Sequence, residues 1–190
     1  MEADWAVEIG GGANVIEPYW AGFVDLRRTP EAAAQLPEAT ILPGLAEVLV
    51  QLNAEGSPVW TAKSDVWEMD EFDPLELGAE HAENLTGVAC YLDLLPHDEM
   101  KWSTHSDAVE WCRLVCGRLH AIALRGCRMD LVVRAAEFAK GRAGFAITAY
   151  ACAAGIDRTA AQRRLVEALA ALADTLAQET RSPASAKKLQ

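Results

Sequence analysis

The clearest structural signal in this chain lies at residues 128–157, which read RMDLVVRAAEFAKGRAGFAITAYACAAGID. Apolar side chains alternate with polar or small ones from Arg128 to Ala135 and again from Phe145 to Cys152. A period of two is typical of strands that bury one face. The glycine-rich stretch Lys140–Gly144 between them predicts a tight turn. We therefore expect an antiparallel hairpin, which Gly155 closes.

A long helix is predicted directly after this hairpin. Asp157 is a favourable N-cap residue, and the helical pattern continues to about Gln178. Apolar residues recur three and four positions apart on its expected inward face, at Leu165, Val166, Leu169, Leu172, Ala173 and Leu176. Residues 128–178 therefore predict one strand–strand–helix unit.

The middle of the chain predicts a second unit of the same kind. Residues 59–67 and 88–95 have the composition of strands, and Pro96 ends the second of them. A helix is expected over 104–124, because its apolar positions recur at helical spacing and Gly126 follows as its stop.

The N-terminal part predicts a third unit. Residues 5–9 and 14–27 read as the two strands of a long hairpin around a run of three glycines. Thr29 and Pro30 then begin a short helix that Pro37 stops, and a better helix covers residues 43–55.

Together these elements predict an α+β fold in the form of a two-layer sandwich. One mostly antiparallel sheet of about six strands would carry the helices on one face. The recurring order raises the hypothesis that a ββα unit occurs three times. Residues 1–181 would form a single domain, and the polar residues 182–190 would form a C-terminal tail.

Composition indicates a folded protein from a reducing compartment. Apolar residues make up 51% of the chain and charged residues 24%, which is an ordinary globular mixture. There is no apolar run of the roughly 18 residues that a membrane-spanning helix needs, and the first residues lack a signal-peptide pattern. We therefore expect a cytoplasmic protein of bacterial type without membrane contact. An odd number of cysteines without CxxC spacing indicates reduced, buried thiols at Cys90, Cys112, Cys116, Cys127 and Cys152.

Negative charge is concentrated in one part of the chain. The net charge is −11, and acids and bases balance outside residues 64–100. Such a field disfavours nucleic acids and anionic membranes as partners, since both require clustered lysine and arginine. It favours basic proteins or cations. No lysine or arginine occurs between Ser64 and Met100, whereas eleven acidic residues do: Asp65, Glu68, Asp70, Glu71, Asp73, Glu76, Glu80, Glu83, Asp93, Asp98 and Glu99.

The acidic segment Glu68–Glu83 predicts a recognition surface for a basic protein partner. Aromatic and aliphatic residues are interleaved with its carboxylates, and interfaces draw affinity from such anchors while charge sets association rate and specificity. The first hypothesis is therefore a non-catalytic interaction protein, such as an inhibitor, immunity-type or adaptor protein. Its expected partner-binding residues are Trp67, Glu68, Asp70, Glu71, Phe72, Asp73 and Glu76.

The alternative hypothesis is a small enzyme with a carboxylate-lined site, with or without a divalent metal, on a helix-free sheet face. Strand alternation places Lys63, Asp65, Asp93, Asp130 and Arg134 at polar positions in otherwise apolar strands. Such carboxylates could bind Mg²⁺ or Mn²⁺, with the lysine or arginine orienting an anionic substrate group. The same pattern also fits a solvated face with cross-strand ion pairs.

The sequence favours the non-catalytic hypothesis because it lacks catalytic spacings. A GxSxG elbow, a P-loop, an HExxH motif and an EF-hand loop are all missing. Gly10, Gly11 and Gly12 do not open a helix, so they do not form a dinucleotide fingerprint. Cys112 and Cys116 lack the second ligand pair that a structural zinc site needs. We accordingly predict no cofactor and no bound metal. A concave pocket that holds Asp65, Asp93 and Asp130 would favour the enzyme, and a protruding acidic ridge the binding protein.

Overall fold

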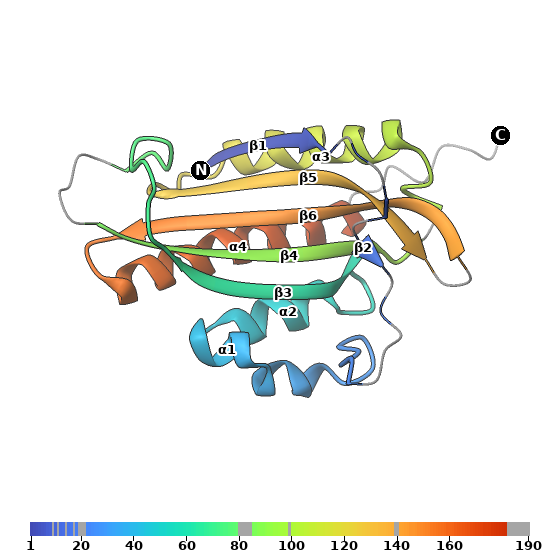
Figure 1. The fold of residues 1–190 in the computed structure, drawn as a ribbon, viewed down its shortest axis with the longest axis horizontal. Helices are drawn as coiled ribbons and strands as arrows, with labels where there is room; N and C mark the ends of the chain where they lie inside the picture. Colours follow the sequence, from blue (N-terminus) through green and yellow to red (C-terminus); the bar gives the residue numbers. More distant parts are fainter. Residues whose placement is uncertain are drawn as a thin grey trace.

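The protein has an α+β fold in which helices pack on one mixed sheet (Figure 1). The computed structural model describes residues 1–8, 10, 12–13, 15–16, 18, 22–79, 85–98, 100–138 and 141–181. The predicted tail, residues 182–190, lies outside them. In chain order the elements are β1 (Glu2–Val7), β2 (Val15–Ile16), η1 (Pro30–Gln35), α1 (Pro37–Ile41), α2 (Leu45–Leu52), β3 (Val59–Met69), β4 (Thr86–Pro96), α3 (His105–His120), β5 (Cys127–Phe138), β6 (Arg142–Gly155) and α4 (Arg158–Arg181).

Two of the three predicted hairpins are confirmed. In the described part of the chain, five strands lie in the order β1-β5-β6-β4-β3, and the short β2 also pairs with β5. The pairs β3–β4 and β5–β6 are antiparallel, and so is β4–β6, which joins the two hairpins into one sheet. The alternating patterns in residues 59–67, 88–95 and 128–152 therefore identified the correct strands.

The prediction of an N-terminal hairpin is wrong. β1 pairs in parallel with β5, from Glu2 opposite Arg128 to Val7 opposite Val133, and β2 also runs parallel to β5. The alternating pattern of β1 is real, because Ala3 is buried and Trp5 and Val7 pack against the core. A period of two does not specify the partner of a strand, and the free edge of β5 provides one. The sheet is consequently mixed rather than mostly antiparallel, and the threefold ββα repetition is not confirmed.

The helices begin where capping chemistry predicts. The Thr104 hydroxyl accepts a hydrogen bond from the Asp107 backbone N–H at 3.2 Å ahead of α3, and Asp157 Oδ1 accepts one from the Ala160 N–H at 2.8 Å ahead of α4. Pro37, however, begins α1 instead of only ending the preceding helix. Proline is tolerated in the first helical turn, where its missing N–H has no intrahelical partner.

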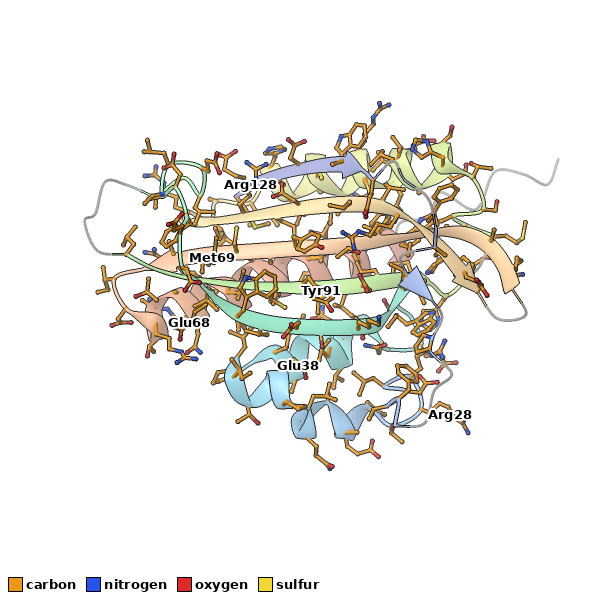
Figure 2. All side chains as sticks on the ribbon, in the orientation of Figure 1. Arg28, Glu38, Glu68, Met69, Tyr91 and Arg128 are labelled. Carbon is orange, nitrogen blue, oxygen red and sulfur yellow. The ribbon has the colours of Figure 1, made fainter. Side chains whose placement is uncertain are left out.

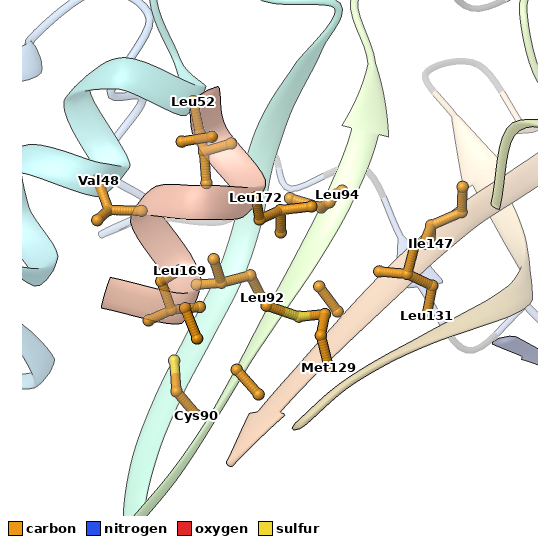
Figure 3. Packing of buried hydrophobic residues seen from close by; sticks show 14 of the residues in the cluster. Val48, Leu52, Cys90, Leu92, Leu94, Met129, Leu131, Ile147, Leu169 and Leu172 are labelled. Carbon is orange, nitrogen blue, oxygen red and sulfur yellow. The ribbon is translucent and has the colours of Figure 1, made fainter. Parts of the chain in front are cut away.

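The main core lies between the sheet and the helices. Figure 1 shows α3 and α4 on the same side of the sheet, with α2 next to β3. Alternate residues of the central strands point to this side, where Leu92 and Leu94 of β4 meet Leu169 and Leu172 of α4 (Figure 3). The other residues of each strand point to the opposite side of the sheet, which we call the open face.

One end of the open face is covered by a smaller core. The partly buried Phe23, from the segment before η1, packs against this second cluster. The middle of the open face is thereby left between this end and the acidic segment. The buried members of the smaller core are Val15, Trp60, Ala62, Leu95, Ala136, Phe138 and Ala146.

All five cysteines are free, and four of them are buried. Burial raises the pKa of the Cys90, Cys112 and Cys116 thiols to about 12, and that of the half-buried Cys152 to about 11. Because the thiolate is the reactive form of cysteine, these side chains act as small hydrophobic groups in this fold.

Candidate functional site

The strand register aligns polar and aromatic side chains across the open face. One row, contributed by five neighbouring strands, consists of Asp65, Tyr91, Tyr150, Asp130 and Asp4. These residues alternate with members of the main core along each strand, so their side chains project away from α3 and α4. The next row places Lys63 opposite Asp93 and Asp93 opposite Thr148. Four of the five residues of the enzyme hypothesis thus lie in two adjacent rows of one face.

Three aromatic side chains from adjacent strands form a continuous strip, which we call the aromatic row: Trp67, Tyr91 and Tyr150. The ring centroids of Trp67 and Tyr91 are 6.3 Å apart, and those of Tyr91 and Tyr150 are 6.0 Å apart. Trp67 is 39% exposed. Arg134 extends the strip, because its guanidinium lies 5.6 Å from the centre of the Tyr150 ring and donates a hydrogen bond of 3.1 Å to the Tyr150 hydroxyl.

Both arginines of β5 on the open face are paired with carboxylates. Arg128 Nε lies 2.9 Å from each oxygen of Asp130, and Arg128 Nη2 lies 3.9 Å from Asp4. Arg134 Nε lies 2.8 Å from Glu8 Oε2. The Arg128–Asp130 pair lies within β5, whereas the contacts with Asp4 and Glu8 join β5 to the chain of β1, which runs parallel to it. Such pairing offsets the positive charge of the face and leaves its acidic character dominant.

Asp93 is the buried ionisable group of this face. It is 5% exposed, and its Oδ1 accepts a hydrogen bond of 2.6 Å from the hydroxyl of Thr148, which is completely buried. Burial raises the pKa of the Asp93 carboxyl, against the opposing effects of the Thr148 hydrogen bond and the positive charges of Arg134 and Lys63. Ionisation of Asp93 is therefore expected to lower the stability of the folded protein.

Replacing Asp93 by asparagine is expected to raise the melting temperature at pH 7. The folded-state pKa of Asp93 is raised, so the stability that this group contributes is complete below its unfolded value of 3.8 and is lost as pH rises through the folded value. Asparagine removes this loss and can still accept from Thr148. We expect a gain of about 2–4 °C, the shift that roughly 1 kcal/mol produces in a chain of this length.

Thermal unfolding of wild type and Asp93→Asn between pH 3 and pH 7 measures this effect. The gain should shrink as pH falls towards 3.8, because wild-type Asp93 is then protonated in both states. Asp65→Asn is the matched control, since Asp65 is an exposed carboxylate in the next row. An equal gain in both variants, or a gain independent of pH, would contradict the assignment.

The described part of the acidic segment, residues 68–79, folds back against the open face. Phe72 lies over β4, where a Cβ on Gly87 would come within 2.6 Å of its ring, and Leu77 is only 3% exposed. Asp73 Oδ1 accepts from the Leu75 N–H at 2.8 Å, as expected of an N-cap, but residues 74–78 form turns instead of the short helix that this pattern suggests. The segment is therefore an anchored turn, and residues 80–83 lie outside the described chain.

The carboxylates of this segment face a cavity above β5 and β6. The cavity has a volume of about 360 Å³, and its lining includes Glu71, Asp73, Glu76, Arg128 and Asp130. Glu68 instead pairs with Arg158 at the start of α4, at 2.8 Å. Asp70 is exposed beyond the end of β3. The predicted partner-binding residues thus lie at one end of the sheet, where Figure 2 shows Glu68 and Met69. Glu68, however, pairs with α4 and does not line the cavity on the open face.

The structure does not bring the three aspartates of the enzyme hypothesis together as metal ligands. Asp130 lines the cavity under the acidic segment, Asp93 is buried against Thr148, and Asp65 accepts from the Val66 N–H at 2.8 Å. Across the residues that the structure describes, no group of three His, Cys, Asp or Glu side chains could hold a metal ion. The geometry of this face therefore gives no support to metal-dependent catalysis.

Sequence reasoning missed the part of the aromatic row beyond Trp67, which consists of the half-buried Tyr91 and Tyr150. Tyr91 stands two positions before Asp93, and Tyr150 two positions after Thr148, so alternation alone places each tyrosine on the open face. Their alignment across β4 and β6 depends on the register of these two strands. Antiparallel patterning does not give that register, because β4 and β6 are not consecutive in the chain.

Comparisons with known proteins do not assign this chain to a family. Among the described helices, none combines the length and apolar character needed to cross a membrane. Searches with protein-family models, of curated proteins and of solved structures find no match to this chain. Function is therefore inferred from the geometry and the charge of the open face.

Proposed function

We propose that this protein is a non-catalytic interaction protein, of the inhibitor, immunity or adaptor kind, that binds a basic surface of another protein. The binding surface consists of the aromatic row and the acidic segment beside it. The observation that carries this proposal is the position of Trp67, a 39% exposed tryptophan at the end of a strip of three neighbouring aromatic rings on a helix-free face.

The residue types of the strip are those that dominate binding energy at interfaces. Tryptophan, tyrosine and arginine are enriched among the side chains whose loss costs most affinity. Here Trp67, Tyr91, Tyr150 and Arg134 are already held by mutual ring contacts and by a hydrogen bond. Because these side chains are already ordered, binding of a partner would cost them little conformational entropy, which favours tight binding.

The charges around the strip specify a basic partner. Glu71, Asp73 and Glu76 line the cavity at one end of the open face, and Glu68, which pairs with Arg158 of α4, follows Trp67 in β3. Arg128 and Arg134 are paired with carboxylates of this chain, so the surface keeps its negative sign. Complementary charge would accelerate association and exclude acidic partners such as nucleic acids.

Binding is tested by affinity capture, followed by measurement with the purified basic protein that is recovered. Trp67→Ala is expected to weaken binding by about thirtyfold, the effect of losing about 2 kcal/mol at a central aromatic anchor. The quadruple variant Glu68→Ser, Asp70→Ser, Glu71→Ser, Asp73→Ser should weaken binding by at least about tenfold at low salt. The difference in affinity between wild type and the quadruple variant should become smaller at physiological salt, where the screening length is about 8 Å.

The matched control removes the same number of charges from the helical side of the molecule. Glu31, Glu47, Glu55 and Glu110 are exposed and lie on or beside η1, α2 and α3. Their quadruple serine variant should bind like wild type. Recovery of the same proteins by wild type and by both quadruple variants at every salt concentration would show that the acidic segment serves only solubility.

A further inference from the structure

A second cavity, separate from the acidic segment, lies along the outer edge of β3. It has a volume of about 250 Å³. One wall comes from β3 and β4, through Lys63 and Tyr91. The opposite wall comes from the chain before η1, from α1 and from α2, through Phe23, Glu38 and Leu49. We call it the edge cavity; Figure 2 shows Tyr91 and Glu38 on either side of β3.

A β-bulge forms the β3 wall of the edge cavity. The pairing of β3 with β4 shifts by one residue between Thr61 and Lys63. Such a bulge turns the following side chain and often adjoins a functional site. Two hydrogen bonds to the buried Asn53 fix this one: Asn53 Nδ2 donates to the Thr61 hydroxyl at 2.7 Å, and the Thr61 N–H donates to Asn53 Oδ1 at 3.0 Å. These bonds therefore fix the backbone from which Lys63 projects.

The inner walls of the edge cavity are apolar. Leu26 is 5% exposed and Leu49 is 1% exposed, and the half-buried Phe23 and Leu36 complete this lining. Apolar walls with a few convergent polar groups are the usual composition of a small-molecule site. The volume suits a ligand with a short aliphatic or single-ring side chain.

The polar groups of the edge cavity carry both signs of charge. Lys63 provides an ammonium, Glu38 a carboxylate and Tyr91 a hydroxyl, and all three residues line the cavity. Burial first, and then the charges of Asp93, Asp65, Tyr150 and Glu38, raise the pKa of Tyr91. Tyr91 therefore remains protonated at neutral pH and can donate a hydrogen bond.

The pairing of these charges decides the class of ligand. A simple anion would be attracted by Lys63 but repelled by Glu38 of α1, and by Asp65 and Asp93, which lie beside Lys63 on the sheet. A simple cation would be attracted by Glu38 but would meet the ammonium of Lys63. A ligand with both charges can contact both side chains without repulsion from either.

We propose that the edge cavity binds a small zwitterion with an apolar side chain, which is the chemistry of a free aliphatic or aromatic α-amino acid. The ligand carboxylate pairs with Lys63 and accepts from the Tyr91 hydroxyl. The ligand ammonium pairs with Glu38. Its side chain lies against Leu26, Leu36 and Leu49. This site shares Tyr91 with the aromatic row but lies apart from the acidic segment and takes a small molecule, so the inference goes beyond the proposed function.

Titration calorimetry and backbone amide shifts with wild-type protein test the ligand class. Leucine, methionine and phenylalanine are the probes, and 4-methylpentanoate and 3-methylbutylamine are analogues of leucine that each carry one of its charges. At least one amino acid should bind saturably and shift the amides of Ser64 and Tyr91. Each single-charge analogue should bind at least about tenfold more weakly than leucine. Absence of saturable binding at about 10 mM of every probe, or equal binding of an analogue, would overturn the proposal.

Two substitutions test the residues. Lys63→Met and Glu38→Gln should each weaken amino acid binding by at least about tenfold. The matched controls are Lys101→Met and Glu47→Gln, which remove the same charges outside the cavity lining and should leave binding unchanged. Unchanged binding in Lys63→Met or in Glu38→Gln would contradict the assignment.

The two proposals fail separately. The quadruple serine variant of the acidic segment should still bind the amino acid, because Glu68, Asp70, Glu71 and Asp73 do not line the edge cavity. Loss of the protein partner in that variant, with unchanged amino acid binding, would support both proposals. Loss of amino acid binding in the same variant would contradict the separation of the edge cavity from the acidic segment.

Discussion

Replacement of Leu92 by alanine is expected to lower the free energy of unfolding by about 2–5 kcal/mol, the range for a leucine removed from a closed core. Leu92 is completely buried in β4, which lies between β3 and β6. Its side chain faces Leu169 and Leu172 of α4 (Figure 3). A paired strand cannot move towards α4 to fill the space, so most of the cavity would remain.

Denaturant unfolding measures this loss as a shift in midpoint at a constant slope. Leu114→Ala is the control, because Leu114 lies on α3 but is 55% exposed, and its loss should change stability by no more than about 0.5 kcal/mol. A Leu92→Ala variant as stable as Leu114→Ala would mean that β4 does not pack on α4 as described.

The two central hairpins were predictable because their patterning is local. In residues 128–157, a period of two, a glycine-rich turn and an N-cap aspartate all favour the same structure, and β5, β6 and α4 follow them. The same agreement holds for β3, β4 and α3. The N-terminal strand was misassigned because its partner, β5, is more than 100 residues away in the sequence, and no local pattern specifies such a pairing.

Part of the open face was also predictable from the sequence. Alternation correctly put Lys63, Asp65, Asp93, Asp130 and Arg134 on one face, because each interrupts an apolar strand. Alternation did not predict which of these side chains are buried or paired with an opposite charge.

The burial and pairing of these side chains depend on residues that are far away in the sequence. Arg134 is paired with Glu8, which follows β1, the strand whose pairing the sequence did not reveal. Asp93 is hydrogen-bonded to Thr148 of β6, a strand that pairs with β4 but does not follow it in the sequence. Phe72 is similar, since the prediction treats it as an exposed anchor and the structure buries it in part against Gly87.

Replacement of Gly155 by alanine is expected to destabilise the protein by roughly 1–3 kcal/mol or more, although it adds only one methyl group. Gly155 ends β6, where the chain turns into α4. A Cβ at this position would lie 2.4 Å from the Ala161 nitrogen and 2.7 Å from the Ala160 carbonyl carbon. Both are backbone atoms of the first turn of α4, so no change of side-chain rotamer can relieve the contact.

The first turn of α4 resists displacement because Asp157 holds it twice. Its Oδ1 accepts from the Ala160 N–H at 2.8 Å, and its backbone carbonyl accepts from the Ala161 N–H at 3.0 Å. Moving the turn away from Gly155 would weaken these bonds or the packing of α4 on the sheet. Either route lowers the stability of the helix that covers most of the main core.

Gly117→Ala adds the same methyl group where space is open, and is the matched control. Gly117 is exposed within α3, and its Cβ would meet nothing within 4 Å. Alanine there should stabilise the protein by about 0.5–1 kcal/mol, because it restricts the unfolded chain and favours helix. The two variants, compared in one denaturant titration, should move the midpoint in opposite directions. A stabilising Gly155→Ala would place β6 and α4 further apart than the structure does, and would remove the steric reason for glycine at that junction.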